Sequence, residues 1–145
     1  MIEKILVAID GSDNSDRALN FAFDLAQKFK SKILLLTVVP PLFLPIPSLN
    51  VMKSQAVSDA YGELEQSFRA VLSKAEEKTK KVNGKNVFTR LEHGNPDEVI
   101  VDTAKLGNFD VIVVGSRGLS RRDYALGSVS SRVAERANCP VVIVK

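Results

Sequence analysis

Short apolar segments recur along this chain and alternate with stretches of helical periodicity. Four of the five segments are nearly continuous in Val, Ile and Leu, which is typical of strands buried on both faces of a parallel sheet. The remaining segment contains Thr89 and Arg90, which predicts a strand at the edge of that sheet. In chain order the segments are 5–9, 33–39, 87–91, 111–114 and 141–144.

The stretches between these segments carry apolar residues three and four positions apart, as amphipathic helices do. The longest covers residues 61–82 and includes Phe68 in its apolar face. Asn95 followed by Pro96 is typical of a helix start with the asparagine as cap, and a last helix is expected to begin near Ser128. The resulting β-α-β-α-β-α-β-α-β order predicts an α/β fold with helices on both faces of one open parallel sheet, in a single domain that spans the whole chain.

One segment interrupts this alternation. Residues 40–50 contain four prolines within eight positions, which exclude a regular helix or a central strand. We expect a surface connection packed on the core, and the alternative is a flap over a ligand or a subunit contact.

Composition and charge exclude several functional classes. The net charge of +3, from 20 basic and 17 acidic residues, is too small and too evenly spread to indicate a nucleic-acid-binding protein. No apolar run approaches the roughly 20 residues of a membrane span, and the first residues do not form a signal peptide. The single cysteine, Cys139, fits the reducing cytoplasm, and its place before Pro140 favours a small buried residue over a catalytic thiol.

Two turns are expected to meet at the carboxyl ends of neighbouring strands, where open parallel sheets bind ligands. Asp10 and Gly11 follow the first strand, and a glycine-rich loop at residues 115–130 follows the fourth. Glycine lets the backbone approach an anion closely, and the N–H groups of such a loop and of the next helix can hold phosphate oxygens. Small polar residues at a helix start are also ordinary caps, so phosphate binding and capping both remain open. For Asp10, likewise, a ligand contact and a turn that caps the first helix are both open.

Other common site signatures are missing from the sequence. The glycine-rich loop is neither a Walker loop nor a dinucleotide fingerprint, because it has no GKS or GKT and no GxGxxG follows the first strand. His93, the one histidine, has no clustered ligand partners in the sequence, so we expect it in a turn rather than in a metal site.

Six motifs stand at spacings that are specific when taken together. They are ILVAIDGS at 5–12, LLLTVV at 34–39, HGNP at 93–96, DVIVVGSRGL at 110–119, GSVSS at 127–131 and CPVVIV at 139–144. With these motifs the chain resembles the universal stress protein family over essentially its full length. The resemblance implies an open five-stranded sheet in the order 3-2-1-4-5, of the adenine nucleotide alpha hydrolase-like type. It also implies a homodimer through the last strand, whose apolar edge needs a cover; its residues are Val141, Val142, Ile143 and Val144.

Some members of that family bind ATP through a Gly-x2-Gly-x9-Gly-Ser/Thr motif. This chain has Gly115, Gly118, Gly127 and Ser128, but eight residues instead of nine separate the second and third glycines. The resemblance implies that these residues, with Val129 and Ser130, hold phosphates, and Arg117 is a further candidate contact.

The resemblance also assigns residues to the rest of the nucleotide. By position, Ala8 and Ile9 line the base pocket, the backbone of Val38 reads adenine and Val114 closes the pocket floor. Asp10 corresponds to an acidic residue near the ribose or near a phosphate-bound Mg²⁺.

The sequence therefore predicts a cytoplasmic, ATP-binding stress-response or regulatory protein with slow hydrolysis or none, because no paired base and nucleophile and no P-loop lysine are evident. One alternative is a dimeric interaction protein of the same fold that binds no nucleotide, which the shortened loop favours. The other is a weak ATPase or autophosphorylating enzyme. A protein partner is expected but not identified.

Overall fold

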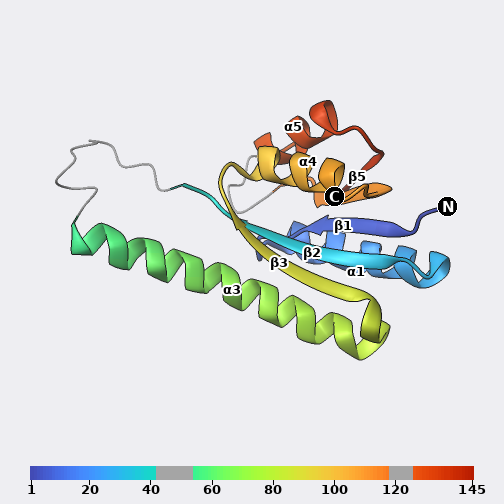
Figure 1. The fold of residues 1–145 in the computed structure, drawn as a ribbon, viewed down its shortest axis with the longest axis horizontal. Helices are drawn as coiled ribbons and strands as arrows, with labels where there is room; N and C mark the ends of the chain where they lie inside the picture. Colours follow the sequence, from blue (N-terminus) through green and yellow to red (C-terminus); the bar gives the residue numbers. More distant parts are fainter. Residues whose placement is uncertain (42–53, 118–125) are drawn as a thin grey trace.

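The computed structural model, which describes residues 1–41, 54–117 and 126–145, is built on a five-stranded parallel sheet (Figure 1). The strand order β3-β2-β1-β4-β5 confirms the predicted 3-2-1-4-5 arrangement, and all four pairings are parallel. The strand with Thr89 and Arg90 lies at one edge, as expected, and the last strand lies at the other. The strands are β1 Lys4–Ala8, β2 Lys32–Val39, β3 Val87–His93, β4 Val111–Gly115 and β5 Val141–Val144.

Helices cover both faces of the sheet. Helices α1 and α3 pack on one face, and α4 and α5 pack on the other (Figure 1). The alternation of strands and helices predicted from the periodicity is confirmed. The helices are α1 Asp13–Phe29, α3 Gln55–Asn83, α4 Pro96–Leu106 and α5 Ser128–Arg136, with a short 3-10 turn at Gly84–Asn86.

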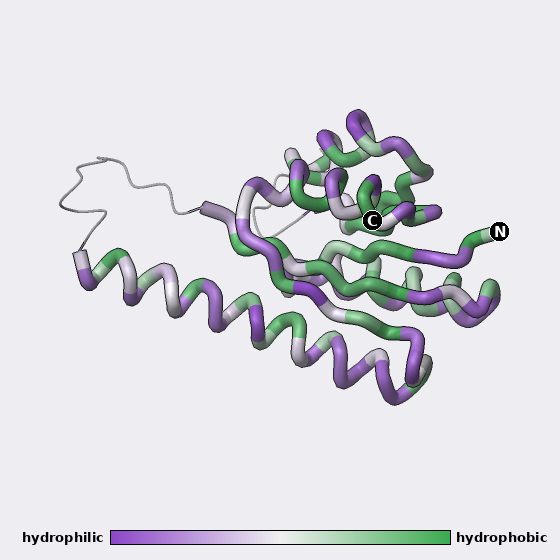
Figure 2. The backbone as a smooth tube through the Cα atoms, in the orientation of Figure 1, coloured by the Kyte–Doolittle hydropathy of each residue, from purple (hydrophilic) through white to green (hydrophobic). Residues whose placement is uncertain are grey.

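The core consists of two apolar clusters, one on each face of the sheet. Ile5 and Val7 of β1 face α1 and α3 in the first cluster, whereas Leu6 faces α4 and α5 in the second. All three side chains are fully buried, and each such burial contributes about 1.5–3 kcal/mol. Both faces of a central strand are thus apolar, and Figure 2 shows the central strands as hydrophobic along most of their length.

Serine side chains cap the starts of α1 and α3, whereas α4 and α5 have no side-chain cap. Ser12 caps α1, and its Oγ accepts a hydrogen bond from the N–H of Ser15 at 3.2 Å. Asn95 stands at the cap position of α4, but its side chain makes no bond to the helix backbone. Its amide instead donates to Glu98 Oε2 at 3.3 Å, so the predicted side-chain cap is wrong in this detail.

The carboxylate of Asp110, just before β4, accepts two hydrogen bonds from the backbone at the start of the chain. Asp110 Oδ2 accepts hydrogen bonds from the N–H groups of Lys4 and Glu3, each at 2.8 Å. These bonds, from Lys4 first and then from Glu3, lower the pKa of Asp110 below its ordinary value of 3.8. Asp110 therefore joins the chain start to the loop before β4 most firmly when it is ionised.

Within the described ranges, no helix is both long enough and apolar enough to cross a membrane. Residues 42–50 of the proline-rich segment, and Gly118 of the glycine-rich loop, lie outside the described residues, so the expectations for them stay predictions.

Candidate functional site

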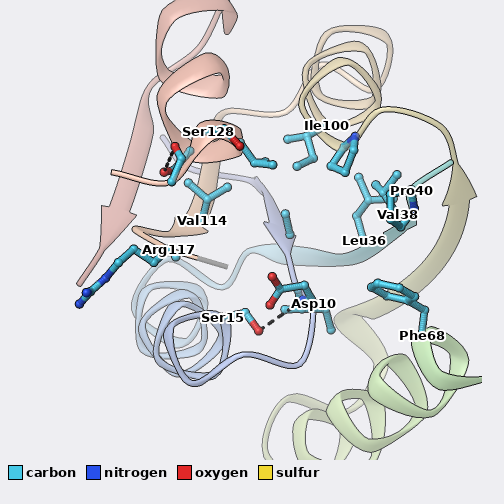
Figure 3. A pocket seen from close by; sticks show the side chains of 17 residues that line it. Asp10, Ser15, Leu36, Val38, Pro40, Phe68, Ile100, Val114, Arg117 and Ser128 are labelled. Carbon is cyan, nitrogen blue, oxygen red and sulfur yellow. Dashed lines mark hydrogen bonds between the residues drawn. The ribbon is translucent and has the colours of Figure 1, made fainter. Parts of the chain in front are cut away.

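A cavity of about 350 Å³ opens at the carboxyl ends of β1, β2 and β4. The strand β1 lies between β2 and β4, so the connections after β1 and β4 leave toward opposite faces of the sheet, which is where such folds bind ligands. The volume lies within the range of small-molecule sites, about 300–1,000 Å³. Figure 3 shows the cavity framed by α5, α4 and α3, with Asp10 and Ser15 below it.

The residues predicted to hold a nucleotide come together around this cavity. Of the twelve residues named from the sequence, all but Gly118 line it, and Gly118 is not among the described residues. The eleven that line the cavity are Ala8, Ile9, Asp10, Val38, Val114, Gly115, Arg117, Gly127, Ser128, Val129 and Ser130. The structure thus places them at one site, and their contacts with a nucleotide remain predictions.

The start of α5 is fastened to the end of β4 by two hydrogen bonds to one carbonyl. The N–H of Gly127 donates to the Ser116 oxygen at 2.7 Å, and the Ser130 hydroxyl donates to the same oxygen at 3.0 Å. Ser130 is only 2% exposed, so its hydroxyl serves this fastening, and its N–H is the group left for an anion.

The first turn of α5 presents free N–H groups to the cavity. The first bond of the helix runs from the Ser131 N–H to the Gly127 oxygen at 3.0 Å. Among the described residues, none accepts from the N–H groups of Ser128, Val129 or Ser130. Together with the positive end of the helix dipole, these N–H groups favour a phosphate there.

Asp10 lies at the opposite wall, in a tight turn. Its Oδ1 accepts the N–H of Ser12 at 2.9 Å, which is the bond of an Asx turn, and its own N–H donates to Ser15 Oγ at 3.3 Å. The turn interpretation is therefore observed, although Ser12 and not Asp10 caps the helix. Within the described ranges no three His, Cys, Asp or Glu side chains gather as a metal site, so Asp10 would offer Mg²⁺ a single carboxylate.

The backbone of Val38 is directed past the end of β1. Backbone groups alternate in direction along a strand: the Leu36 oxygen accepts from Ile9 on the β1 side at 2.9 Å, and the Val39 oxygen accepts from Gly94 on the β3 side at 3.1 Å. The N–H and C=O of Val38 therefore point to the β1 side, where β1 has already ended at Ala8. No hydrogen bond joins either group to a described residue, so both face the cavity.

Gly115 has a packing role that sequence chemistry did not reveal. A Cβ at this position would lie 2.8 Å from the carbonyl carbon of Asn14 and 3.0 Å from its oxygen, well inside ordinary contact. The end of β4 thus approaches the first turn of α1 too closely for any side chain. This packing accounts for the glycine without a phosphate.

Arg117 lies at the cavity but its side chain is turned outward, and His93 lies outside the predicted turn. Arg117 lines the cavity wall, but Figure 3 shows its side chain pointing away from Asp10 and Val38 toward the rim. His93 is not in a turn: it ends β3, and its Nε2 lies 3.0 Å from Glu65 Oε1 of α3. The expectation of a turn is wrong because the strand runs two residues further than its apolar segment.

Sequence reasoning missed several residues that line the site. Phe68 was assigned to a helix face, and for Pro96 a helix start was preferred over a place at the pocket rim. Nothing in either local pattern distinguishes these positions from a cavity wall. The full set of additional lining residues is Ser15, Leu36, Pro40, Phe68, Pro96 and Ile100. Cys139 is partly buried outside this set, and burial, with a smaller effect of the Asp110 charge, raises the pKa of its thiol.

Comparison with known proteins gives a consistent result over the whole chain. Residues 1–145 match the model of the Universal stress protein family. Universal stress protein YxiE of Bacillus subtilis is 34% identical to this chain, with all of both chains covered.

Solved structures share the fold as well. Universal stress protein UspA from Lactobacillus plantarum superposes with a TM-score of 0.86 at 26% identity, covering 99% of this chain and 98% of its own. A universal stress protein in complex with cAMP gives 0.72 at 29% identity, covering 99% and 97%. The universal stress protein from Archaeoglobus fulgidus in complex with dAMP gives 0.67 at 27% identity, with both chains fully covered.

Proposed function

This chain belongs to the universal stress protein family, and on that premise we propose that it binds an adenine nucleotide, ATP, in the cavity at the carboxyl ends of β1, β2 and β4. The observation that supports the proposal is that one cavity is lined by eleven of the residues that the sequence and the family resemblance suggest for a nucleotide. Two relatives of the same fold were solved with cAMP and with dAMP, which are adenine nucleotides.

The cavity divides into parts that suit the parts of a nucleotide. One side is apolar, and there the N–H and C=O of Val38 offer the donor and acceptor pair that the edge of adenine requires. The opposite side holds the first turn of α5, whose N–H groups suit phosphate oxygens. Asp10 lies between them at the height of the ribose, or of a cation bound to the phosphates.

We propose a regulatory role in the stress response, with slow hydrolysis or none. Of the described residues that line the cavity, Asp10 and Arg117 are the only two with ionisable side chains. The arginine points away, and Asp10 is already engaged in its turn, so neither is set up as a general base for an attacking water. Mg²⁺, where present, would be held by Asp10 together with the phosphates themselves.

We further propose that the protein works in the cytoplasm as a homodimer through β5. The oxygens of Pro140 and Val144 accept hydrogen bonds from Ile112 and Ser116 on the β4 side. Because backbone groups alternate in direction along a strand, Val141 and Ile143 direct their N–H and C=O groups outward. All four side chains of β5 are half-buried, so a second copy would complete both the hydrogen bonding and the burial of this edge.

Equilibrium dialysis of nucleotide-stripped protein against labelled ATP, AMP, cAMP and adenosine tests the proposal. Ser128→Glu places a carboxylate at the exposed first position of α5, where it favours the helix but repels phosphate. We expect it to weaken ATP binding at least tenfold and to spare adenosine. Ser131→Glu, on the same helix but outside the cavity lining, is the matched control and should bind as the wild type does. Absence of binding at millimolar ATP would refute the proposal and leave the interaction protein as the better account.

A further inference from the structure

Helix α3 crosses one side of the cavity, and it contacts the end of β3 at one point and the turn after β1 at another. Glu65 Oε1 lies 3.0 Å from His93 Nε2 at the end of β3, and the His93 ring stacks on Tyr61 with centroids 6.1 Å apart. Further along the helix, Val71 packs against the turn after β1, where a Cβ on Gly11 would lie 2.8 Å from Val71 Cγ2. Gly11 has a φ of +87°, so this turn also requires glycine for its conformation.

Phe68 stands midway between these two supports, on the same side of the helix. It is 8% exposed, yet it belongs to neither of the two apolar clusters that hold the sheet to its helices. It lines the cavity, and Figure 3 shows its ring extending from α3 toward Leu36, Val38 and Pro40. A large aromatic side chain that is buried but belongs to neither cluster therefore forms a wall of the ligand site.

We propose that Phe68 is the residue on which the nucleobase stacks. This inference rests on the proposed function and assigns a base-recognition role within the same site. The aromatic ring supplies one wall of a slot whose other wall is Val38 and Pro40 at the end of β2. A planar base entering the slot would meet the ring on its face while its edge meets the backbone of Val38.

Stacking and edge recognition contribute differently to specificity. Every base has a π face, so Phe68 holds any base, and stacking of this kind is worth roughly 5- to 150-fold in affinity when it is lost. The Val38 backbone pair distinguishes adenine from guanine, because a guanine edge presents a carbonyl where adenine presents an amino group. Loss of Phe68 should therefore lower AMP and GMP affinity by the same factor.

The first test compares Phe68→Leu with Phe23→Leu by calorimetry against AMP, GMP and tripolyphosphate. Leucine keeps an apolar side chain of similar burial but has no aromatic face. Phe23 is 7% exposed in the first core cluster and does not line the cavity, so it controls for lost stability. We expect Phe68→Leu to lower the affinity for AMP roughly tenfold. The ratio of the AMP affinity to the GMP affinity, and the affinity for tripolyphosphate, should stay unchanged. Phe68→Tyr, which keeps an aromatic ring, should bind AMP as the wild type does.

The second test uses the absence of tryptophan from the sequence. Phe68→Trp introduces a single fluorophore at the proposed stacking position, and AMP should quench it while tripolyphosphate should not. Phe21→Trp, at a position on α1 that is 42% exposed, should respond to neither.

The outcomes separate the two proposals. If the wild type binds AMP and Phe68→Leu binds it within twofold, the stacking role is refuted while nucleotide binding stands. If Phe68→Leu lowers tripolyphosphate affinity as much as AMP affinity, Phe68 acts through the structure of the whole site and the stacking role is again refuted. If the wild type binds no adenine nucleotide, both proposals fail.

Discussion

Replacing Gly115 with alanine tests the close approach of β4 to α1. The added Cβ would lie 2.8 Å from the Asn14 carbonyl carbon and 3.0 Å from both its Cβ and its oxygen. Ordinary carbon contacts begin near 3.5 Å, so the two elements must separate by roughly 0.7 Å. The nearest atoms belong to the backbone of a helix and cannot rotate away.

The expected loss follows from two opposing effects. Overpacking of this kind lowers the free energy of unfolding by about 1–3 kcal/mol. Alanine also reduces the conformational entropy of the unfolded chain, which raises the free energy of unfolding by about 0.4–1 kcal/mol. The free energy of unfolding should therefore fall by about 1–2 kcal/mol, and the melting temperature by roughly 2–8 °C for a domain of this size. Because the strained contact lies beside the Asp10 turn, nucleotide affinity should fall as well.

Gly127→Ala is the matched control from the same loop. A Cβ there would lie 3.3 Å from the Ser116 oxygen and 3.4 Å from Arg117 Cα, so it requires only a small adjustment. Its φ of −61° and ψ of 155° suit alanine, and we expect a change in stability within about 1 kcal/mol. Urea unfolding followed by circular dichroism measures both variants. Equal stability of Gly115→Ala and the wild type, or a larger loss in Gly127→Ala, would refute the packing argument.

Three further predictions follow from the described contacts. Because hydrogen bonds from the chain start lower the folded-state pKa of Asp110, its contribution to stability is present above pH about 3.8 and is lost as pH falls through that lower pKa. Urea unfolding from pH 7 to pH 2 should therefore show the difference in unfolding free energy between wild type and Asp110→Asn shrinking in that window. A constant difference would contradict this reasoning. Ile143→Pro removes an N–H that points outward from β5 and leaves the hydrogen bonds between β4 and β5 in place. Sedimentation at ~100 µM should show that this variant is a folded monomer and that the wild type is a dimer. A monomeric wild type would count against the interface. Asp10→Asn keeps the side-chain oxygen that accepts the turn hydrogen bond but removes the negative charge. Calorimetry should therefore show weaker binding of MgATP and unchanged or stronger binding of metal-free ATP. Equal effects on both ligands would show that Asp10 does not bind the metal.

The sheet was predictable because its strands are buried on both faces. Leu6 and Val7 point in opposite directions, yet both are fully buried, so a central strand must be apolar at every position and is visible as a continuous run. The edge strand was equally visible, since Arg90 cannot be buried between two layers. The strand order came from the family resemblance, because strand pairing is not encoded locally.

The sequence predicted most of the residues that line the site, but not the directions in which their side chains point. The glycine-rich loop and Asp10 were identified because ligands bind where the connections after neighbouring parallel strands diverge, and because glycine and small polar residues there suit an anion. The sequence did not reveal that the Ser130 hydroxyl is committed to the Ser116 carbonyl, or that Arg117 points outward, because both depend on how α5 docks on β4. Phe68 was assigned to the core because helical periodicity is the same for a core position and for a cavity wall.

The central position of β1 sets the timing of folding during synthesis. β1 pairs with β2 soon after both emerge, but its other edge pairs with β4, about 100 residues later in the chain. At synthesis rates of about 5–20 residues per second, that edge stays unpaired for roughly 5–20 s. For that interval one edge of β1, whose Ile5, Leu6 and Val7 are all apolar, offers free backbone groups to other nascent chains. Until β4 pairs with it, this edge is a place where association between nascent chains is favoured.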